Sequence, residues 1–270
     1  MKRHFIPLSF FLQRFIPGKY VPTISKKIHD ENEIEQRINF KGLAVGNGAM
    51  APPDCHVYGD FLYQLGLIDQ NTREGCKSHE AAMKNYTANG QWTLAWLEWN
   101  AEVNLFLGEM GCNYYLDHTQ CHEEYEEGNY NDYVNKESTR IAAHVGDIPF
   151  GKQSGEVYNK LIPDIMKSEK ETVEFLLERY PVLFYNGNLD IVCHHTGTIE
   201  MLNAMENWSG KEEFLRTSAE IFEVNGDTAG YLTSVQNLRL LAVRNAGHMV
   251  PRSQPEVAYE MFSKFLQGNL

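Results

Sequence analysis

Two short turns, each directly after an apolar run, constrain this chain more than any other feature of its sequence. One turn carries Asp190, within Tyr185–Cys193, and the other carries His248, within Val243–Pro251. A buried strand that ends in a glycine-containing turn projects a polar side chain from one edge of a sheet. An aspartate followed later in the chain by such a histidine is one order in which a Ser-His-Asp triad is supplied. We therefore expect an α/β sheet with both side chains at the same edge.

Hydrophobic periodicity predicts the elements around these turns. The final helix is expected to end before Gly268 and to begin with a capping box at Ser253–Glu256. The other expected elements are a helix over Thr23–Glu33, a buried strand over Phe40–Val45, an aromatic helix over Trp92–Trp99, one amphipathic helix over Pro163–Tyr180, and strands over Val182–Tyr185 and Leu238–Val243.

Several ordered blocks of the chain resemble the serine carboxypeptidase family, and the vitellogenic-like and lysosomal branches in particular. The resemblance covers roughly Gly18 to the C-terminus. Its blocks are Gly18–Ile24, Phe40–Gly48 with its Gly-Asn-Gly turn, Phe61–Asp69, Cys112–Cys121, Ala143–Gly146, Tyr185–Cys193 and the turn of His248.

The resemblance implies an α/β fold: a partial α/β-hydrolase sheet, made of the C-terminal strands and helices, with a mostly helical cap insertion. It implies that residues 1–49 are a remnant of the core, that residues 50–135 form the cap, and that residues 136–270 are the C-terminal part of the core. Asp190 would then orient the imidazole of His248, the catalytic base. Asn47 and Gly48 are expected to shape a turn near the site.

The nucleophile of the triad is missing from the sequence. No G-x-S-x-G occurs in the 270 residues. Counting back from Gly18 places Phe15 where the family has its serine. Ser9 lies in an apolar run without the glycines that a nucleophile elbow needs, and Ser154 has glycines at the wrong spacing. Without a serine hydroxyl, the histidine has nothing to deprotonate.

Complete relatives hydrolyse C-terminal peptide bonds, so peptide or protein C-termini are the partners that the resemblance implies. This chain keeps Asp190 and His248 and is expected to be inactive as it stands. The residues leave two further interpretations open, a non-catalytic carboxypeptidase-like binding protein and a mis-spliced or mis-predicted fragment. A homodimer is also left open.

The five cysteines are an odd number. Cys55, Cys76, Cys112 and Cys121 allow two disulfides in three connectivities. The resemblance implies that the partner of Cys193 lies in a part of the family that has no counterpart here, so Cys193 is expected to be unpaired. A zinc site at Cys112 and Cys121 with His118 and His122 is disfavoured, because zinc ligands usually come in closer pairs. We expect no metal and no cofactor.

The formal charge of −12 argues against nucleic acid as a partner, because phosphates would be repelled. No apolar run reaches the length of a membrane span. The family implies the secretory pathway, lysosomal or extracellular, although the N-terminus shows no convincing signal peptide. Two sequons, at Asn85 and Asn207, are compatible with glycosylation in that pathway.

Overall fold

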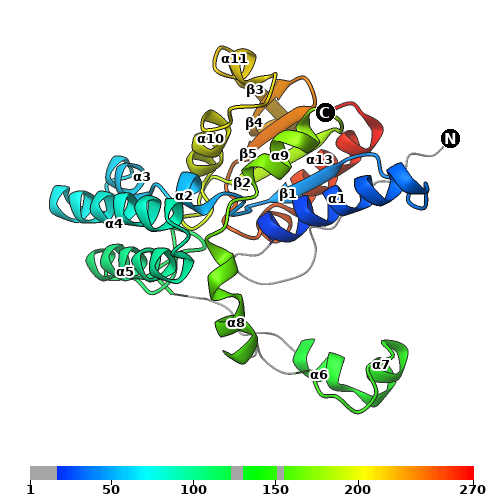
Figure 1. The fold of residues 1–270 in the computed structure, drawn as a ribbon, viewed down its shortest axis with the longest axis horizontal. Coiled ribbons are helices and arrows are strands. Elements are labelled where there is room, and N and C mark those ends of the chain that lie inside the picture. The colour runs from blue at the N-terminus through cyan, green and yellow to red at the C-terminus, as the bar shows by residue number, and fades with distance from the viewer. Residues whose placement is uncertain (1–16, 123–129, 151–154) are drawn as a thin grey trace.

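The computed structural model describes residues 17–122, 130–150 and 155–270, and shows an open sheet with a helical region beyond one end of it (Figure 1). Ser9, Phe15 and Ser154 lie outside the described residues. The strands are β1 (Leu43–Gly46), β2 (Val182–Gly187), β3 (Glu220–Val224), β4 (Asp227–Val235) and β5 (Leu238–Val243). The helices are α1 (Pro17–Ile34), α2 (Pro52–Cys55), α3 (Tyr58–Gln64), α4 (Gln70–Ala88), α5 (Trp92–Met110), α6 (Tyr130–Asn135), α7 (Glu137–Ala142), α8 (Gly155–Ile165), α9 (Lys170–Leu177), α10 (His195–Asn203), α11 (Lys211–Phe214), α12 (Val250–Ser253) and α13 (Pro255–Gln267).

The five described strands form one sheet in the order β1-β2-β5-β4-β3. The first three are parallel, and β4 and β3 add an antiparallel hairpin at one edge. All six residues of β2 are buried, as a parallel strand covered on both faces requires. At the other edge, β1 pairs with β2 and with no further strand among the described residues. The fold class is thus α/β, as expected from the sequence.

Helices cover both faces of the sheet. On one face, Val45 and Phe184 pack in a core with residues of α1, α9 and α10. On the other face, Leu183 and Leu241 pack against α13. A separate core holds α3, α4 and α5 together and includes residues 191–193, directly after the turn of Asp190. The helical region, α3 to α5, is therefore packed against the loop that follows Asp190 and shares a core with it. No described helix is long and apolar enough to cross a membrane.

Two sequence predictions about helices were wrong. The expected helix over Pro163–Tyr180 falls on two helices, the end of α8 and all of α9. The chain between them is not helical, because the Glu169 N–H donates to the Met50 carbonyl at 2.8 Å and not to a carbonyl one turn earlier. The capping box at Ser253–Glu256 is absent. Instead, α13 begins after Gln254 with Pro255 in its first turn and no side-chain cap. Proline suits that position because the first amides of a helix have no partner inside it.

The hairpin of β3 and β4 was missed by sequence analysis. Its turn is Asn225-Gly226, with φ of 55° and 86°. Both values lie in the left-handed region that a two-residue hairpin turn requires, and Asn-Gly is the usual pair there. The turn could therefore have been recognised in the sequence. The hairpin was missed because β3 has little hydrophobic pattern: Phe222 is its only buried residue.

A buried carboxyl group lies between the helices of the helical region. Glu102 on α5 is fully buried, and neither of its carboxyl oxygens has a hydrogen-bond partner among the described residues, while the charge that acts on it is that of Glu80 on α4. Glu80 in turn accepts a hydrogen bond from the Gly59 N–H on α3 at 2.9 Å. Burial, with the charge of Glu80 beside it, raises the pKa of Glu102 to about 10. Glu102 is thus protonated at neutral pH.

Glu102→Gln should stabilise the protein increasingly as pH rises. A carboxyl whose pKa is raised on folding stabilises fully below its unfolded pKa, near 4.3, and loses that contribution as pH rises toward 10, by about 1.4 kcal/mol per pH unit. Glutamine has nearly the same shape and has no proton to lose. The difference in melting temperature between variant and parent should therefore be larger at pH 8 than at pH 5. Glu109→Gln, an exposed change on the same helix, is the control. A difference that stays constant with pH would contradict the raised pKa of Glu102.

Candidate active site

The pairing of β2 with β5 brings Asp190 and His248 together. The two strands are parallel and in register from Val182–Leu238 to Gly187–Val243, so they end at the same edge. Beyond them the two turns bond to each other: the Leu189 N–H donates to the Ala246 carbonyl at 2.9 Å. Gly187 must be glycine here, because a Cβ would lie 2.1 Å from the Gly247 carbonyl oxygen.

The carboxylate of Asp190 is fully buried and has three hydrogen-bond donors. Its Oδ2 lies 2.8 Å from Nδ1 of His248 and 2.6 Å from Nδ2 of Asn47. Its Oδ1 accepts from the Val192 N–H at 2.9 Å. A buried carboxylate needs such partners to offset the loss of water. Because both oxygens are bonded, these donors hold the carboxylate in one orientation.

Asn47 belongs to the site more directly than the sequence suggested. It follows β1 with φ of 44° and is buried. Its amide donates to Asp190, while its Oδ1 accepts from the Gly187 N–H at 3.3 Å. The expectation of a turn-shaping residue was incomplete, because this side chain also binds the acid. The Gly-Asn-Gly turn was a usable signal, since asparagine tolerates the left-handed region better than most residues.

The ring of His248 lies at the wall of a cleft of roughly 300 Å³ that is also lined by Tyr114, Asp117, Gln120, Met249 and Arg252. Nδ1 faces Asp190, which leaves Nε2 as the nitrogen able to exchange a proton with a substrate. Among the described residues, no hydroxyl group is hydrogen-bonded to the ring. The arrangement can therefore hold and release a proton at Nε2, with Asp190 offsetting the positive charge of the protonated ring.

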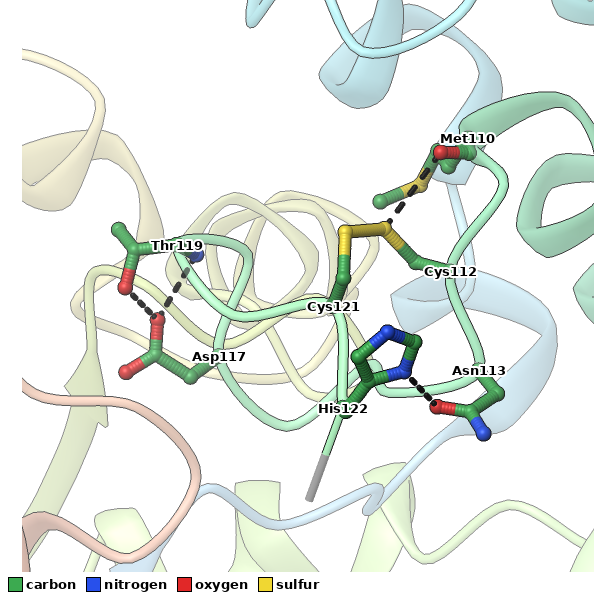
Figure 2. Close-up of a disulfide and its surroundings, with 7 residues drawn as sticks. All are labelled: Met110, Cys112, Asn113, Asp117, Thr119, Cys121 and His122. Carbon is green, nitrogen blue, oxygen red and sulfur yellow. Dashed lines mark hydrogen bonds between the residues drawn. A yellow bond between two sulfur atoms is a disulfide. The ribbon is translucent and has the colours of Figure 1, made fainter. Parts of the chain in front are cut away.

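A disulfide loop braces both turns of the site. Cys112 and Cys121 form the disulfide that closes the loop drawn in Figure 2. The Leu116 carbonyl accepts from the His248 N–H at 2.7 Å, and the His118 N–H donates to the Leu189 carbonyl at 2.8 Å. Because both cysteines are oxidised, they cannot form the zinc site weighed above. His122 bonds instead to Asn113 (Figure 2).

Of the two disulfides that four cysteines allow, the structure has one. Cys55 and Cys76 are free and buried, and so is Cys193, which the sequence analysis expected to be unpaired. Burial raises the pKa of Cys55 and of Cys76 to about 12, and that of Cys193 well above its usual value. Thiols in such surroundings are poor nucleophiles, because the reactive form is the thiolate.

Asp190, Cys193 and His248 could in principle hold a metal ion, since one ligand atom from each lies within 4.8 Å of the others. Both oxygens of Asp190 already accept hydrogen bonds from the protein. An ion would have to break at least one of these bonds to bind. The geometry favours the hydrogen-bonded pair over a metal centre.

Two buried histidines, His56 and His194, lie behind the site. His56 stacks on Tyr58 and Trp99, and His194 stacks on Phe61. Burial lowers the pKa of each to about 3, so both rings are neutral over the physiological range. His194 caps α10 by accepting from the Gly197 N–H at 3.0 Å. It is thus a structural residue at the start of α10.

Comparison with known proteins supports the resemblance seen in the sequence. The family model described as Serine carboxypeptidase matches residues 17–268. The venom serine carboxypeptidase of Apis mellifera is 33% identical over 92% of this chain and 55% of its own length. The vitellogenic carboxypeptidase of Aedes aegypti is 34% identical over 93% of this chain and 55% of its own length. A serine carboxypeptidase-like protein of Pisum sativum is 35% identical over 94% of this chain and 93% of its own length.

A solved structure shares the fold. The prohormone-processing carboxypeptidase Kex1(delta)p of Saccharomyces cerevisiae matches with a TM-score of 0.75 at 18% identity, over 94% of this chain and 61% of its own. The present chain therefore spans about half the length of the bee and mosquito relatives, and somewhat more of the yeast structure.

Thiol titration should find three free thiols in protein unfolded without reductant, and far fewer that react in the native state. The reason is that Cys55, Cys76 and Cys193 are buried with raised pKa values, whereas Cys112 and Cys121 are joined. Peptide mapping identifies the bonded pair. A Cys55–Cys76 disulfide, or a fast-reacting Cys193, would contradict the structure.

His56→Phe should make the protein more resistant to acid. A histidine whose pKa is lowered on folding contributes its full stability above the unfolded pKa, near 6.5, and loses it as pH falls toward 3. At pH 5 that loss is about 2 kcal/mol. Phenylalanine keeps the stacking and cannot be protonated, so its advantage in melting temperature should grow from pH 7 to pH 5. His118→Phe, a half-exposed change, is the control. An equal advantage at both pH values would count against the neutral ring.

Proposed function

Because the chain belongs to the serine carboxypeptidase family, we propose that Asp190 and His248 are the acid and base of a serine carboxypeptidase triad. The observation that carries this proposal is the buried hydrogen bond of 2.8 Å between Asp190 Oδ2 and His248 Nδ1. Asp190 holds the ring in the tautomer with Nε2 free and stabilises it once protonated. The three donors around Asp190 fix its carboxylate before a substrate binds, so the carboxylate does not have to turn during a reaction.

The reaction of such a triad is the hydrolysis of a C-terminal peptide bond. A serine hydroxyl attacks the carbonyl of the last peptide bond, and its proton passes to Nε2 of His248. The same proton then goes to the departing amino group of the C-terminal residue, which leaves an acyl-enzyme ester. Water hydrolyses the ester with His248 again as base, and the serine is regenerated. Peptides with a free C-terminus are thus the proposed substrate class.

Counting back from Gly18 without a gap places Phe15 at the position of the family's serine. A phenylalanine has no hydroxyl to lose, so the acyl-enzyme cannot form at that position. We therefore propose that the chain keeps the acid and base of the family and does not hydrolyse peptides by itself. Loss of the nucleophile of a triad removes nearly all of its rate advantage.

The secretory pathway is the proposed location. The disulfide Cys112–Cys121 is typical of proteins made in an oxidising compartment. Of the two sequons, Asn85 has an exposed side chain, whereas Asn207 donates to Glu174 at 3.3 Å and precedes the buried Trp208. Asn85 is therefore the better glycan acceptor of the two.

Fluorophosphonate labelling tests the proposal. The purified chain should not be labelled and should release no C-terminal amino acids from peptides, because the probe reports a serine activated by a base. Labelling that His248→Ala and Asp190→Ala both abolish would reveal a nucleophile elsewhere and would overturn the inactive state. Sequencing the transcript across Phe15 to Gly18 gives the independent control, because it shows whether the printed residues are those of the expressed protein.

A further inference from the structure

Tyr58 connects the helical region to the loop of Asp190. It is fully buried at the start of α3. Its hydroxyl donates to the Val192 carbonyl at 2.9 Å and accepts from Nε1–H of Trp99, on α5, at 3.1 Å. Both bonds lie in the interior, where an unpaired polar group is costly. The phenol therefore fixes the position of Val192 relative to α3 and α5.

Val192 is itself a contact of the acid. Its N–H donates to Asp190 Oδ1 at 2.9 Å, while its carbonyl is held by Tyr58. The backbone of this one residue is thus bonded on both sides, on one side to the carboxylate and on the other to the phenol. The two groups belong to neighbouring peptide units that meet at the Val192 Cα, so a displacement of that atom would disturb both bonds.

We propose that Tyr58 is a positioning residue for Asp190, acting through the backbone of Val192 and supported by Trp99. This inference rests on the proposed function only in taking Asp190 and His248 as an acid–base pair. Without the phenol hydroxyl, the buried Val192 carbonyl loses the bond that Tyr58 donates to it. Residues 190–193 then shift to find other bonds, and Asp190 loses the donor that fixes its Oδ1. The carboxylate becomes free to turn about its last bond, which loosens its hold on Nδ1 of His248.

Another anchor in the same loop does not replace this one. Asn186 Nδ2 donates to the Cys193 carbonyl at 3.0 Å, one residue further along. That bond holds the end of the loop to β2 but makes no contact with Asp190 or with Val192 N–H. Its presence predicts that the loop keeps its overall course when Tyr58 is changed, and that the change is concentrated at the carboxylate.

The test is the proton on Nδ1 of His248, followed by NMR in protein with ¹⁵N-labelled histidine. His248→Ala assigns the signal by its loss. Tyr58→Phe removes only the hydroxyl, and it should speed exchange of this proton with water by about tenfold, the factor expected from losing one buried hydrogen bond. Tyr180→Phe is the matched control, because it also removes one phenol hydrogen bond, to His29 at 2.7 Å, in another part of the fold.

Unchanged exchange at His248 in Tyr58→Phe would overturn the proposal, and so would an equal acceleration in Tyr180→Phe. If Tyr58→Phe does not fold, Trp99→Phe decides, because it keeps an aromatic ring beside His56 and removes the donor to the phenol. It should accelerate exchange by a smaller factor, and no acceleration would overturn the relay. This readout needs neither nucleophile nor substrate. The proposal for Tyr58 therefore survives if the labelling experiment contradicts the proposed function. The proposed function likewise survives if the exchange measurement contradicts the role of Tyr58.

Discussion

The parallel pairing of β2 with β5 is the constraint on which the rest of the structure depends. Gly187 pairs with Val243 at the last step of the register, and the two following turns then bond to each other through Leu189 and Ala246. A slip of one residue would reverse the faces of a strand whose every residue is buried. It would also remove Gly187 from the one place where a missing Cβ lets the turns approach. Core packing and site geometry therefore enforce the same register.

Three buried titratable groups in this fold differ in their hydrogen-bond partners. Asp190 has three donors, from Asn47, Val192 and His248, and these offset the loss of water around a buried carboxyl group. Neither carboxyl oxygen of Glu102 has a hydrogen-bond partner among the described residues, and this group remains protonated. His56 has stacking partners but no hydrogen-bond partner among the described residues, and it remains neutral. Of these three groups, only Asp190 has hydrogen bonds that compensate for its burial.

The sequence could predict the elements whose signals are local. The strand at Leu238–Val243 is found with its expected bounds, and the turns of Asp190 and His248 follow their strands as expected. What it could not predict rests on contacts between distant residues. The helix expected over Pro163–Tyr180 breaks because Glu169 bonds to Met50, and Asn47 contacts an acid 143 positions away. Neither contact leaves a periodic trace, because each joins single residues of different elements.

The proposed acid and base, Asp190 and His248, are held by parts of the fold that do not involve a nucleophile. The disulfide loop bonds to the His248 backbone, Asn47 bonds to Asp190 from the turn after β1, and Tyr58 bonds to the loop of Asp190 from α3. Each of these contacts stabilises the folded chain whether or not a serine is present, because each satisfies a buried polar group. An intact Asp190–His248 pair is therefore evidence about folding and ancestry, and activity requires separate evidence at the nucleophile. The two questions separate physically, since the bond between Asp190 and His248 forms with no hydroxyl group of the described residues bonded to the ring.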